Sequence, residues 1–254
     1  MICIIQGGNK VKKYSFIIAL MVMVLAFSGC YMVQTSKEFF GIGIEGKAVL
    51  FVLDVSGSME GKDEGSIKDK LQAEAVDRAA SEVNKSVGGK VGSIISSVIR
   101  KESTKLGEAK RQLIPAVKGL PPDVRFTILL FGGQVKPWQA TLVEANASNK
   151  GYAVAYLQGL KSGGGTPAKA ALQQAFNFRG VDEIYFLTDG HPTDGSAATI
   201  LSMVKKLNPG HRVTINTVGL GDDQDRNFLC ELAMQNNGIY VRDETPECKA
   251  PGRP

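Results

Sequence analysis

An uninterrupted apolar run, Val49 to Leu53, ends abruptly in Asp-Val-Ser-Gly-Ser and limits the fold more than any other part of this chain. A short, continuously apolar run is typical of a strand buried on both faces. Such a strand would deliver Asp54, Ser56 and Ser58 to the loop at its carboxyl end. Their carboxylate and hydroxyls are hard oxygen ligands that suit Mg²⁺, Mn²⁺ or Ca²⁺. The first hypothesis is a metal site, and the alternative is a helix cap followed by ordinary turn residues.

The remainder of the chain alternates between strand and helix patterns. Strands are predicted over 47–53, 124–131, 134–140, 181–187, 213–218 and 238–242, and helices over 66–85, 106–120, 147–160, 167–177, 197–207 and 225–235. Strands separated by helices of this length indicate a parallel sheet covered on both faces. Residues 134–140 follow a Gly-Gly turn and look like an antiparallel hairpin partner. We therefore expect a doubly wound α/β fold, mostly parallel, with one antiparallel edge strand.

Polar residues gather where these strands end. Asp54 follows one buried strand, Asp189 follows another in Leu-Thr-Asp-Gly, and Thr166 lies in a Gly-rich turn at a helix entrance. In open α/β sheets the functional crevice lies outside the carboxyl ends of the strands. Three separate segments thus supply oxygen ligands to one place.

Taken in order, Asp-x-Ser-x-Ser, Gly-Gly-Gly-Thr-Pro and Leu-Thr-Asp-Gly resemble the three loops of a von Willebrand factor type A (vWA) domain over about residues 45 to 243. The resemblance implies a Rossmann-like fold with a metal-ion-dependent adhesion site (MIDAS). Carried over to this chain, the implied ligands of Mg²⁺, or else Mn²⁺ or Ca²⁺, are Asp54, Ser56, Ser58, Thr166 and Asp189, and the rim of the site would include Gly165, Gly190 and His191.

In that family a partner protein's acidic side chain can complete the coordination of the ion. The implied function is therefore metal-dependent protein–protein interaction or adhesion, without catalysis. Two alternatives remain: a metal-dependent hydrolase or phosphatase, and a structural accessory that does not use the metal. Against the phosphatase, Ser56 stands where haloacid-dehalogenase-like enzymes need a second acid, and no Gly-x-Ser-x-Gly motif with a triad accompanies it.

One segment departs from a minimal domain of this family. The first helix usually begins soon after the serine motif, whereas here its best match is 106–120. We expect a helical insertion over about 60–104 that forms an accessory subdomain shaping or covering the site. An extended first helix is the alternative.

The N-terminus has the pattern of a targeting signal. Three lysines precede the apolar stretch 16–27, which is too short to span a bilayer as a mature helix. The following Ser-Gly-Cys resembles a bacterial lipoprotein signal. This predicts a signal peptide over 1–29, with a true start near Val11 as a further hypothesis, lipidation of Cys30 and a tether over 30–45. An ordinary secretory signal with another cleavage point is the alternative.

This signal predicts export and membrane anchoring in the bacterial cell envelope, in the periplasm or at the cell surface. The outer membrane is favoured in a Gram-negative host, because Tyr31 rather than Asp follows Cys30. Removal of residues 1–29 takes away three lysines and no acids, so the formal charge falls from +5 to +2. The small net charge of the exported part then gives no reason to expect a nucleic-acid partner.

Two cysteines remain in the exported part, Cys230 and Cys248. An oxidising compartment favours a disulfide between them, which would tie a late helix to the expected C-terminal tail, 244–254. The alternative is that Cys230 is a buried free thiol.

Overall fold

The computed structural model describes residues 37–61, 104–242 and 245–251, and the single residues 78, 81, 82, 85 and 93. The predicted signal peptide, Cys30 and most of the predicted insertion lie outside these residues. Within the described part of the chain, no helix combines the length and the apolar character needed to cross a bilayer.

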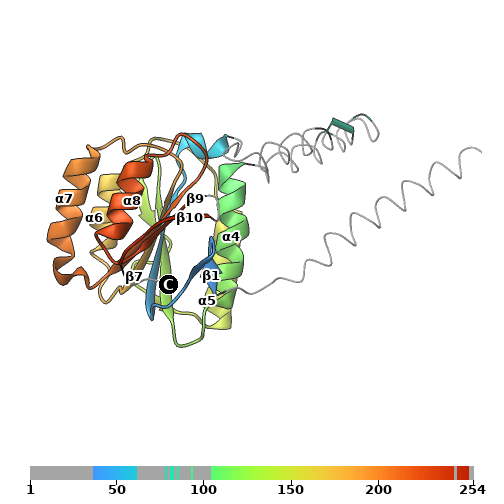
Figure 1. The fold of residues 1–254 in the computed structure, drawn as a ribbon. Coiled ribbons are helices and arrows are strands. Elements are labelled where there is room, and N and C mark those ends of the chain that lie inside the picture. The colour runs from blue at the N-terminus through green and yellow to red at the C-terminus, as the bar shows by residue number, and fades with distance from the viewer. Residues whose placement is uncertain are drawn as a thin grey trace, which may run out of the picture. The chain divides into compact units, whose positions relative to one another are not determined.

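The described residues contain an eight-stranded sheet with helices on both faces (Figure 1). Its strands are β3 (Ala48–Asp54), β4 (Arg125–Phe131), β5 (Val135–Pro137), β6 (Val143–Glu144), β7 (Glu183–Thr188), β8 (Thr214–Gly219), β9 (Ile239–Arg242) and β10 (Thr245–Lys249). The order is β10-β9-β8-β7-β3-β4-β5, and β6 also pairs with β4. Strands β3, β4, β7, β8 and β9 run parallel, whereas β5, β6 and β10 are antiparallel to their neighbours. The predicted doubly wound, mostly parallel fold is confirmed, but antiparallel strands lie at both edges instead of one.

The two faces of the sheet carry separate hydrophobic cores. Helices α4 (Lys105–Gly119) and α5 (Ala147–Gln158) cover one face, and α6 (Ala168–Ala175), α7 (Ala197–Leu207) and α8 (Arg226–Met234) cover the other (Figure 1). Along β3, Val49, Phe51 and Leu53 pack in the first core. Leu50 and Val52 pack in the second. A strand that is apolar at every position is thereby buried on both faces, as its sequence predicted.

Helices α4 and α5 are linked by reciprocal lysine contacts. The Lys110 ammonium donates to the carbonyl oxygen of Leu160, beyond the end of α5, at 2.8 Å. The Lys150 ammonium donates to the carbonyl oxygen of Lys118, near the end of α4, at 3.0 Å. Each cation thus satisfies a carbonyl group at a helix carboxyl end, where the helix dipole also favours positive charge.

A short hairpin before β3 belongs to the core. It consists of β1 (Glu38–Phe39) and β2 (Ile42–Gly43), and both Phe39 and Phe40 are 1% exposed. The Phe39 ring meets the Phe51 ring edge to face at 5.6 Å. The expected tether over 30–45 is therefore wrong in its later part, because the domain already begins at this hairpin. Strands of two residues are too short to show a period in the sequence.

The C-terminal segment is also part of the sheet. Residues 245–249 form β10, which pairs antiparallel with β9 and carries a register shift between Pro246 and Cys248. The expected tail over 244–254 is therefore wrong for these residues. The sequence Thr-Pro-Glu-Cys-Lys has neither the alternation nor the β-branched content from which a strand is predicted.

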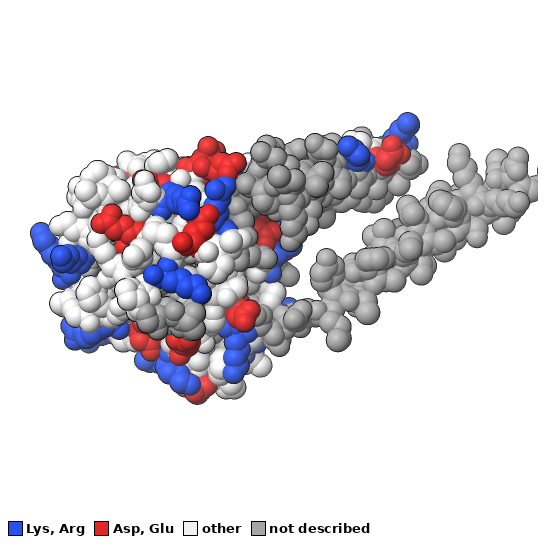
Figure 2. Space-filling model, viewed as in Figure 1, with Lys and Arg blue, Asp and Glu red and all other residues white. Residues whose placement is uncertain are grey.

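Basic and acidic side chains are interspersed on the face of the domain that Figure 2 shows. Among the described residues of this face, neither sign forms a continuous patch. A mixed charge pattern of this kind does not by itself steer a strongly charged partner to this face.

Candidate metal site

The order of the strands reverses at one point in the sheet. The chain passes from β3 through α4 to β4 on one side, and from β7 through α7 to β8 on the other, while β3 and β7 are direct neighbours. Ligand crevices in such sheets lie outside the carboxyl ends of the strands at this switch point. Asp54 is the last residue of β3 and Asp189 directly follows β7, and both are 0% exposed. The fold therefore brings these two predicted ligands to the same end of adjacent strands.

Asp54 fixes the first loop through both oxygens of its carboxylate. Its Oδ1 accepts the backbone N–H of Ser56 at 2.7 Å, and its Oδ2 accepts the hydroxyl of Thr188 at 2.5 Å. Burial raises the pKa of Asp54 to about 6, although the hydrogen bonds from Ser56 and Thr188 oppose this rise, and the nearby Asp189 adds to it. A nearby cation would favour the ionised carboxylate.

The hydroxyls of Ser56 and Ser58 connect this loop to Asp189. The two Oγ atoms lie 3.0 Å apart, and Ser58 Oγ donates to Asp189 Oδ1 at 2.8 Å. Ser58 lies in the short 3₁₀ helix η1 (Gly57–Glu60), which directly follows the loop. Three predicted ligands thus form a continuous series of oxygen atoms.

The Gly-rich loop before α6 is fastened to the first loop by backbone hydrogen bonds. Gly163 donates to the carbonyl oxygen of Val55 at 2.7 Å, and Gly57 donates to that of Gly164 at 2.9 Å. Gly164 has a φ of +85°, and a Cβ there would lie 2.2 Å from the backbone of Gly133. Glycine is required at position 164 because the backbone is left-handed there and because it passes close to the backbone of Gly133.

Thr166 lies at the end of this loop and is 5% exposed. Its backbone N–H donates to the Thr193 hydroxyl at 3.1 Å, and its carbonyl oxygen accepts the Thr193 N–H at 2.9 Å. Its hydroxyl oxygen is 3.8 Å from the position that a Cβ on Gly190 would occupy. The threonine hydroxyl is therefore adjacent to the residue that follows Asp189.

The residues expected at the rim have different surroundings. The N–H of Gly190 donates to the Thr188 hydroxyl at 3.3 Å, and a Cβ on Gly165 would meet the Thr193 hydroxyl at 3.2 Å. His191 is exposed, and its Nδ1 is 3.3 Å from an Asp225 oxygen in the loop before α8. The imidazole therefore contacts a carboxylate outside the predicted ligand set.

Sequence reasoning missed two residues that contact a predicted ligand directly, Lys105 and Thr188. The ammonium of Lys105 lies 2.9 Å from Asp189 Oδ2, and the side chains of Lys105 and Asp189 are 8% and 0% exposed. Lys105 begins α4 and follows the predicted insertion, so its distance from the serine motif in the sequence hides this contact. Thr188 was missed although it stands inside the Leu-Thr-Asp-Gly motif.

The donor set fits a hard divalent cation. It contains two carboxylates and three hydroxyls, all of them oxygen donors. In the part of the chain that the structure describes, no group of three or more His, Cys, Asp or Glu side chains is placed to hold an ion. An ion at the switch point would therefore depend on hydroxyl groups and water as well as on Asp54 and Asp189.

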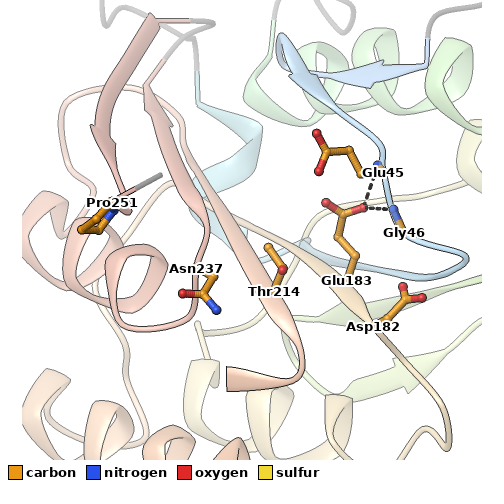
Figure 3. A pocket seen from close by; sticks show the side chains of 7 residues that line it. All are labelled: Glu45, Gly46, Asp182, Glu183, Thr214, Asn237 and Pro251. Carbon is orange, nitrogen blue, oxygen red and sulfur yellow. Dashed lines mark hydrogen bonds between the residues drawn. The ribbon is translucent and has the colours of Figure 1, made fainter. Parts of the chain in front are cut away.

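A separate cavity of about 390 Å³ lies at the amino ends of the strands (Figure 3). Its lining includes Glu183, whose Oε2 accepts the backbone N–H groups of Gly46 at 2.8 Å and Glu45 at 3.1 Å. Burial raises the pKa of Glu183, and these hydrogen bonds partly oppose the rise. The Glu183 carboxylate thus fastens the segment before β3 to the start of β7, so its contacts are those of a structural residue.

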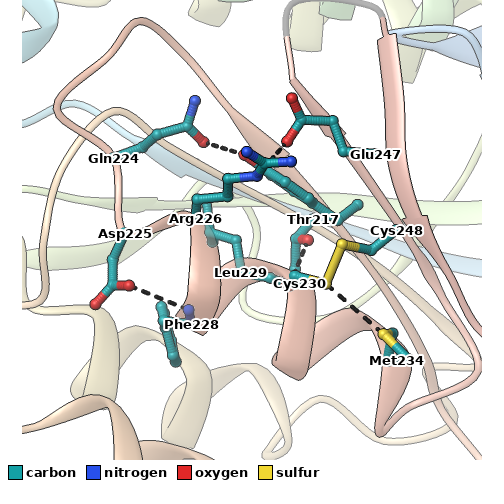
Figure 4. Close-up of a disulfide and its surroundings, with 11 residues drawn as sticks. Thr217, Gln224, Asp225, Arg226, Phe228, Leu229, Cys230, Met234, Glu247 and Cys248 are labelled. Atoms are coloured by element: carbon teal, nitrogen blue, oxygen red, sulfur yellow. Dashed lines mark hydrogen bonds and ion pairs between the residues drawn. A yellow bond between two sulfur atoms is a disulfide. The ribbon is translucent and has the colours of Figure 1, made fainter.

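Cys230 and Cys248 are bonded to each other in the structure. Their sulfur atoms are 2.10 Å apart and their Cα atoms 5.6 Å apart, and the bond connects α8 to β10 (Figure 4). An ion pair between Arg226 and Glu247, at 2.7 Å, joins the same two elements. The last strand is therefore fastened covalently and electrostatically to the helix that covers it.

The fold and the site define an α/β domain in which buried polar side chains gather at the switch point of the sheet. The model of the von Willebrand factor type A domain family matches residues 96–242, and the chain belongs to this family. The matched range begins after the first loop, so Asp54, Ser56 and Ser58 lie outside it.

Relatives share the domain but are much longer proteins. The chain is 29% identical over 157 residues to the pig inter-alpha-trypsin inhibitor heavy chain H1, covering 56% of this chain and 17% of the relative. It is 34% identical over 117 residues to the human von Willebrand factor A domain-containing protein 3A, covering 45% of this chain and 10% of the relative. The chain thus spans less than a fifth of either protein.

Solved structures share the fold at low sequence identity. A von Willebrand factor type A protein from Catenulispora acidiphila has a TM-score of 0.55 at 17% identity, covering 79% of this chain and 39% of that one. An aerotolerance-related membrane protein from Bacteroides fragilis has a TM-score of 0.52 at 18% identity, covering 78% and 91%. At this identity the likeness establishes the fold alone.

Proposed function

We propose that this domain binds a divalent cation, Mg²⁺ or else Mn²⁺ or Ca²⁺, and uses it to hold an acidic side chain of a partner protein. The proposed ligands are Asp54, Ser56, Ser58, Thr166 and Asp189. The observation that carries the proposal is the series of contacts Ser56 Oγ to Ser58 Oγ to Asp189 Oδ1, at 3.0 and 2.8 Å, across the switch point of the sheet. Domains of this family generally act as interaction and adhesion modules, which supports binding over catalysis.

The residues of the proposed site have different roles. Asp54 holds the first loop in shape through Ser56 and Thr188, so that the Ser56 and Ser58 hydroxyls lie beside Asp189. The bound ion would supply a hard, positively charged centre that attracts a carboxylate. Gly165, Gly190 and His191 would form the surface that a partner meets around the ion.

Export and lipid anchoring form a second part of the proposal. They are supported by the sequence from the lysines at 10–13 to Cys30, and a disulfide between Cys230 and Cys248 suits an oxidising compartment. We infer a lipid-modified Cys30 and a location in the bacterial cell envelope. Metabolic labelling with a palmitate analogue should mark the wild-type protein and leave Cys30→Ser unmarked, and equal labelling of both would contradict this part.

Calorimetric titration with Mg²⁺ and with Mn²⁺ tests the metal site. Wild-type protein should bind one ion, Ser58→Ala should bind it at least tenfold more weakly, and Asp54→Ala should show no measurable binding. Asp223→Asn is the matched control, because this exposed carboxylate lies outside the site and should leave binding unchanged. Circular dichroism checks that each variant is folded. Equal binding by wild type, Ser58→Ala and Asp54→Ala would overturn the proposal.

Capture of partner proteins tests whether the domain uses the ion to bind them. Tagged domain should retain envelope proteins in Mg²⁺ and release them in EDTA, and the Ser58→Ala variant should retain fewer of them. A partner whose binding depends on the ion should also lose affinity when its acidic contact residue is replaced by an amide. Retention that is unchanged by EDTA would argue against an ion-held carboxylate.

A further inference from the structure

The ion pair between Lys105 and Asp189 places a buried ammonium group within the candidate metal site. The Lys105 Nζ to Asp189 Oδ2 distance is 2.9 Å, and the two side chains are 8% and 0% exposed. Nearly complete burial removes water that would otherwise screen the pair. Water and salt therefore screen the charge of Lys105 less than they screen the charge of a surface lysine.

The two oxygens of Asp189 have different partners. Oδ1 accepts the hydroxyl of Ser58 at 2.8 Å, while Oδ2 accepts the ammonium of Lys105 at 2.9 Å. Lys105 thus holds the carboxylate with one oxygen toward the serine hydroxyls.

The start of α4 is anchored beside the site by its backbone and by its cap. Its backbone N–H donates to the carbonyl oxygen of Gly61 at 3.0 Å, and the preceding Thr104 caps the helix by accepting the N–H of Gly107 at 3.0 Å. The backbone that carries Lys105 is therefore anchored beside the site, and its side chain is buried there.

We propose that Lys105 is a built-in counter-cation, which positions Asp189 in the ion-free domain and weakens the binding of a divalent cation. Of the charged groups at the site, Asp54 and Asp189 are formally negative and Lys105 is positive, so an incoming ion meets one net negative charge instead of two. Like charges repel strongly where the effective dielectric constant is low. This inference rests on the proposed metal function, because it concerns the strength with which that ion is held.

Replacement of Lys105 by methionine tests the proposal, because methionine keeps much of the apolar stem and removes the charge. Without ion, Lys105→Met should melt at a lower temperature than wild type, because Asp189 is left buried without its partner. The same variant should bind Mg²⁺ and Mn²⁺ at least tenfold more tightly in calorimetry. The rise in melting temperature on adding either ion should consequently be larger for the variant. A merely structural role would lower both stability and affinity.

Two control variants and one substitute for Lys105→Met complete the test. Lys105→Arg retains the charge and should bind both ions within about threefold of wild type, a difference of roughly 0.7 kcal/mol. Lys205→Met removes an exposed lysine from α7 and should change neither stability nor affinity. If Lys105→Met does not fold, Lys105→Gln carries the test, since it keeps an N–H donor without the charge and should also bind the ions more tightly.

The outcomes separate this inference from the proposed function. If wild type binds neither ion, the metal function itself fails. If wild type binds an ion but the neutral variants bind it equally or more weakly, only the role of Lys105 as a counter-cation is overturned.

Discussion

The backbone N–H of Lys105 donates to the carbonyl oxygen of Gly61 at 3.0 Å, although residues 62–104 separate them in the sequence. Gly61 and Lys105 therefore lie side by side, next to the candidate metal site. The helical insertion expected over about 60–104 lies largely outside the described residues and stays a prediction.

Deletion of residues 62–103, with Gly61 joined directly to Thr104, should leave a folded domain. The two ends are already held together, so a single connecting residue suffices, and shortening a loop removes part of its closure entropy cost. We expect the free energy of unfolding to change by no more than about 2 kcal/mol, measured by urea unfolding followed by circular dichroism. Loss of the cooperative transition would show that the deleted residues are part of the core.

Gly164→Ala should disturb the site where the Gly-rich loop crosses Gly133. An alanine there would need a φ of +85° and would bring its Cβ to 2.2 Å from the Gly133 backbone. We expect a loss of roughly 2–4 kcal/mol in the free energy of unfolding and weaker Mg²⁺ binding. Gly151→Ala in α5 is the matched control, because a Cβ there meets nothing within 4 Å. This control should be neutral or stabilising by up to about 1 kcal/mol. Equal behaviour of the two variants would contradict the prediction.

The ion-free domain should lose stability as the pH rises toward 6 because of Asp54. Burial raises its pKa from 3.8 to about 6, so the folded state holds the proton more tightly than the unfolded state. Its stabilising contribution is complete below about pH 4 and is lost as the pH rises through about 6, with a total on the order of 3 kcal/mol.

Urea unfolding of wild type and Asp54→Asn in EDTA, from pH 4 to pH 7.5, measures this contribution. The stability of wild type relative to the variant should fall across this range, because asparagine does not titrate. A constant difference between the two proteins would show that Asp54 has an ordinary pKa. Addition of Mg²⁺ should reduce the fall for wild type, since a cation favours the ionised carboxylate.

Reduction of the disulfide should loosen the last strand. The bond joins Cys230 in α8 to Cys248 in β10 and closes a short stretch of chain with a sequence separation of 18. We expect the Cys230→Ser, Cys248→Ser double variant to lose about 3 kcal/mol. Hydrogen exchange should speed up in β10 more than in β3, which lies in the middle of the sheet. Unchanged exchange in β10 would show that its other contacts hold it without the bond.

The parts of the fold that were predictable are those with a strong local signal. The expected strand over 124–131 corresponds to β4 (Arg125–Phe131), and the expected helix over 106–120 corresponds to α4 (Lys105–Gly119), because long apolar runs and helical periods identify them. The hairpin at Phe39 was missed because its strands are too short to show a period. The strand at Cys248 was missed because its sequence lacks the alternation and the β-branched residues of a predicted strand. Tertiary contacts alone make them part of the domain.

The candidate site was predictable to the extent that its residues lie in recognisable motifs. Asp54 and Asp189 follow apolar strands, and the structure places both at the switch point of the sheet. Lys105 could not be assigned to the site, because no local pattern links the first residue of α4 to the end of β7. That link exists only once residues 61 and 105 have come together in the folded domain.

The strands that close the sheet on its two sides have a shared chemical character. On one side β5 contains Lys136 and Pro137, and on the other β10 contains Pro246, Lys249 and a register shift. Proline has no N–H to offer a neighbouring strand, and lysine charge and irregular register hinder a further strand from aligning. The disulfide therefore does more than hold α8 against β10. It also keeps β10, which is poorly suited to pairing with a further strand, on the outer edge of β9. Its loss would expose that edge to strand addition by a second chain, a first step toward aggregation.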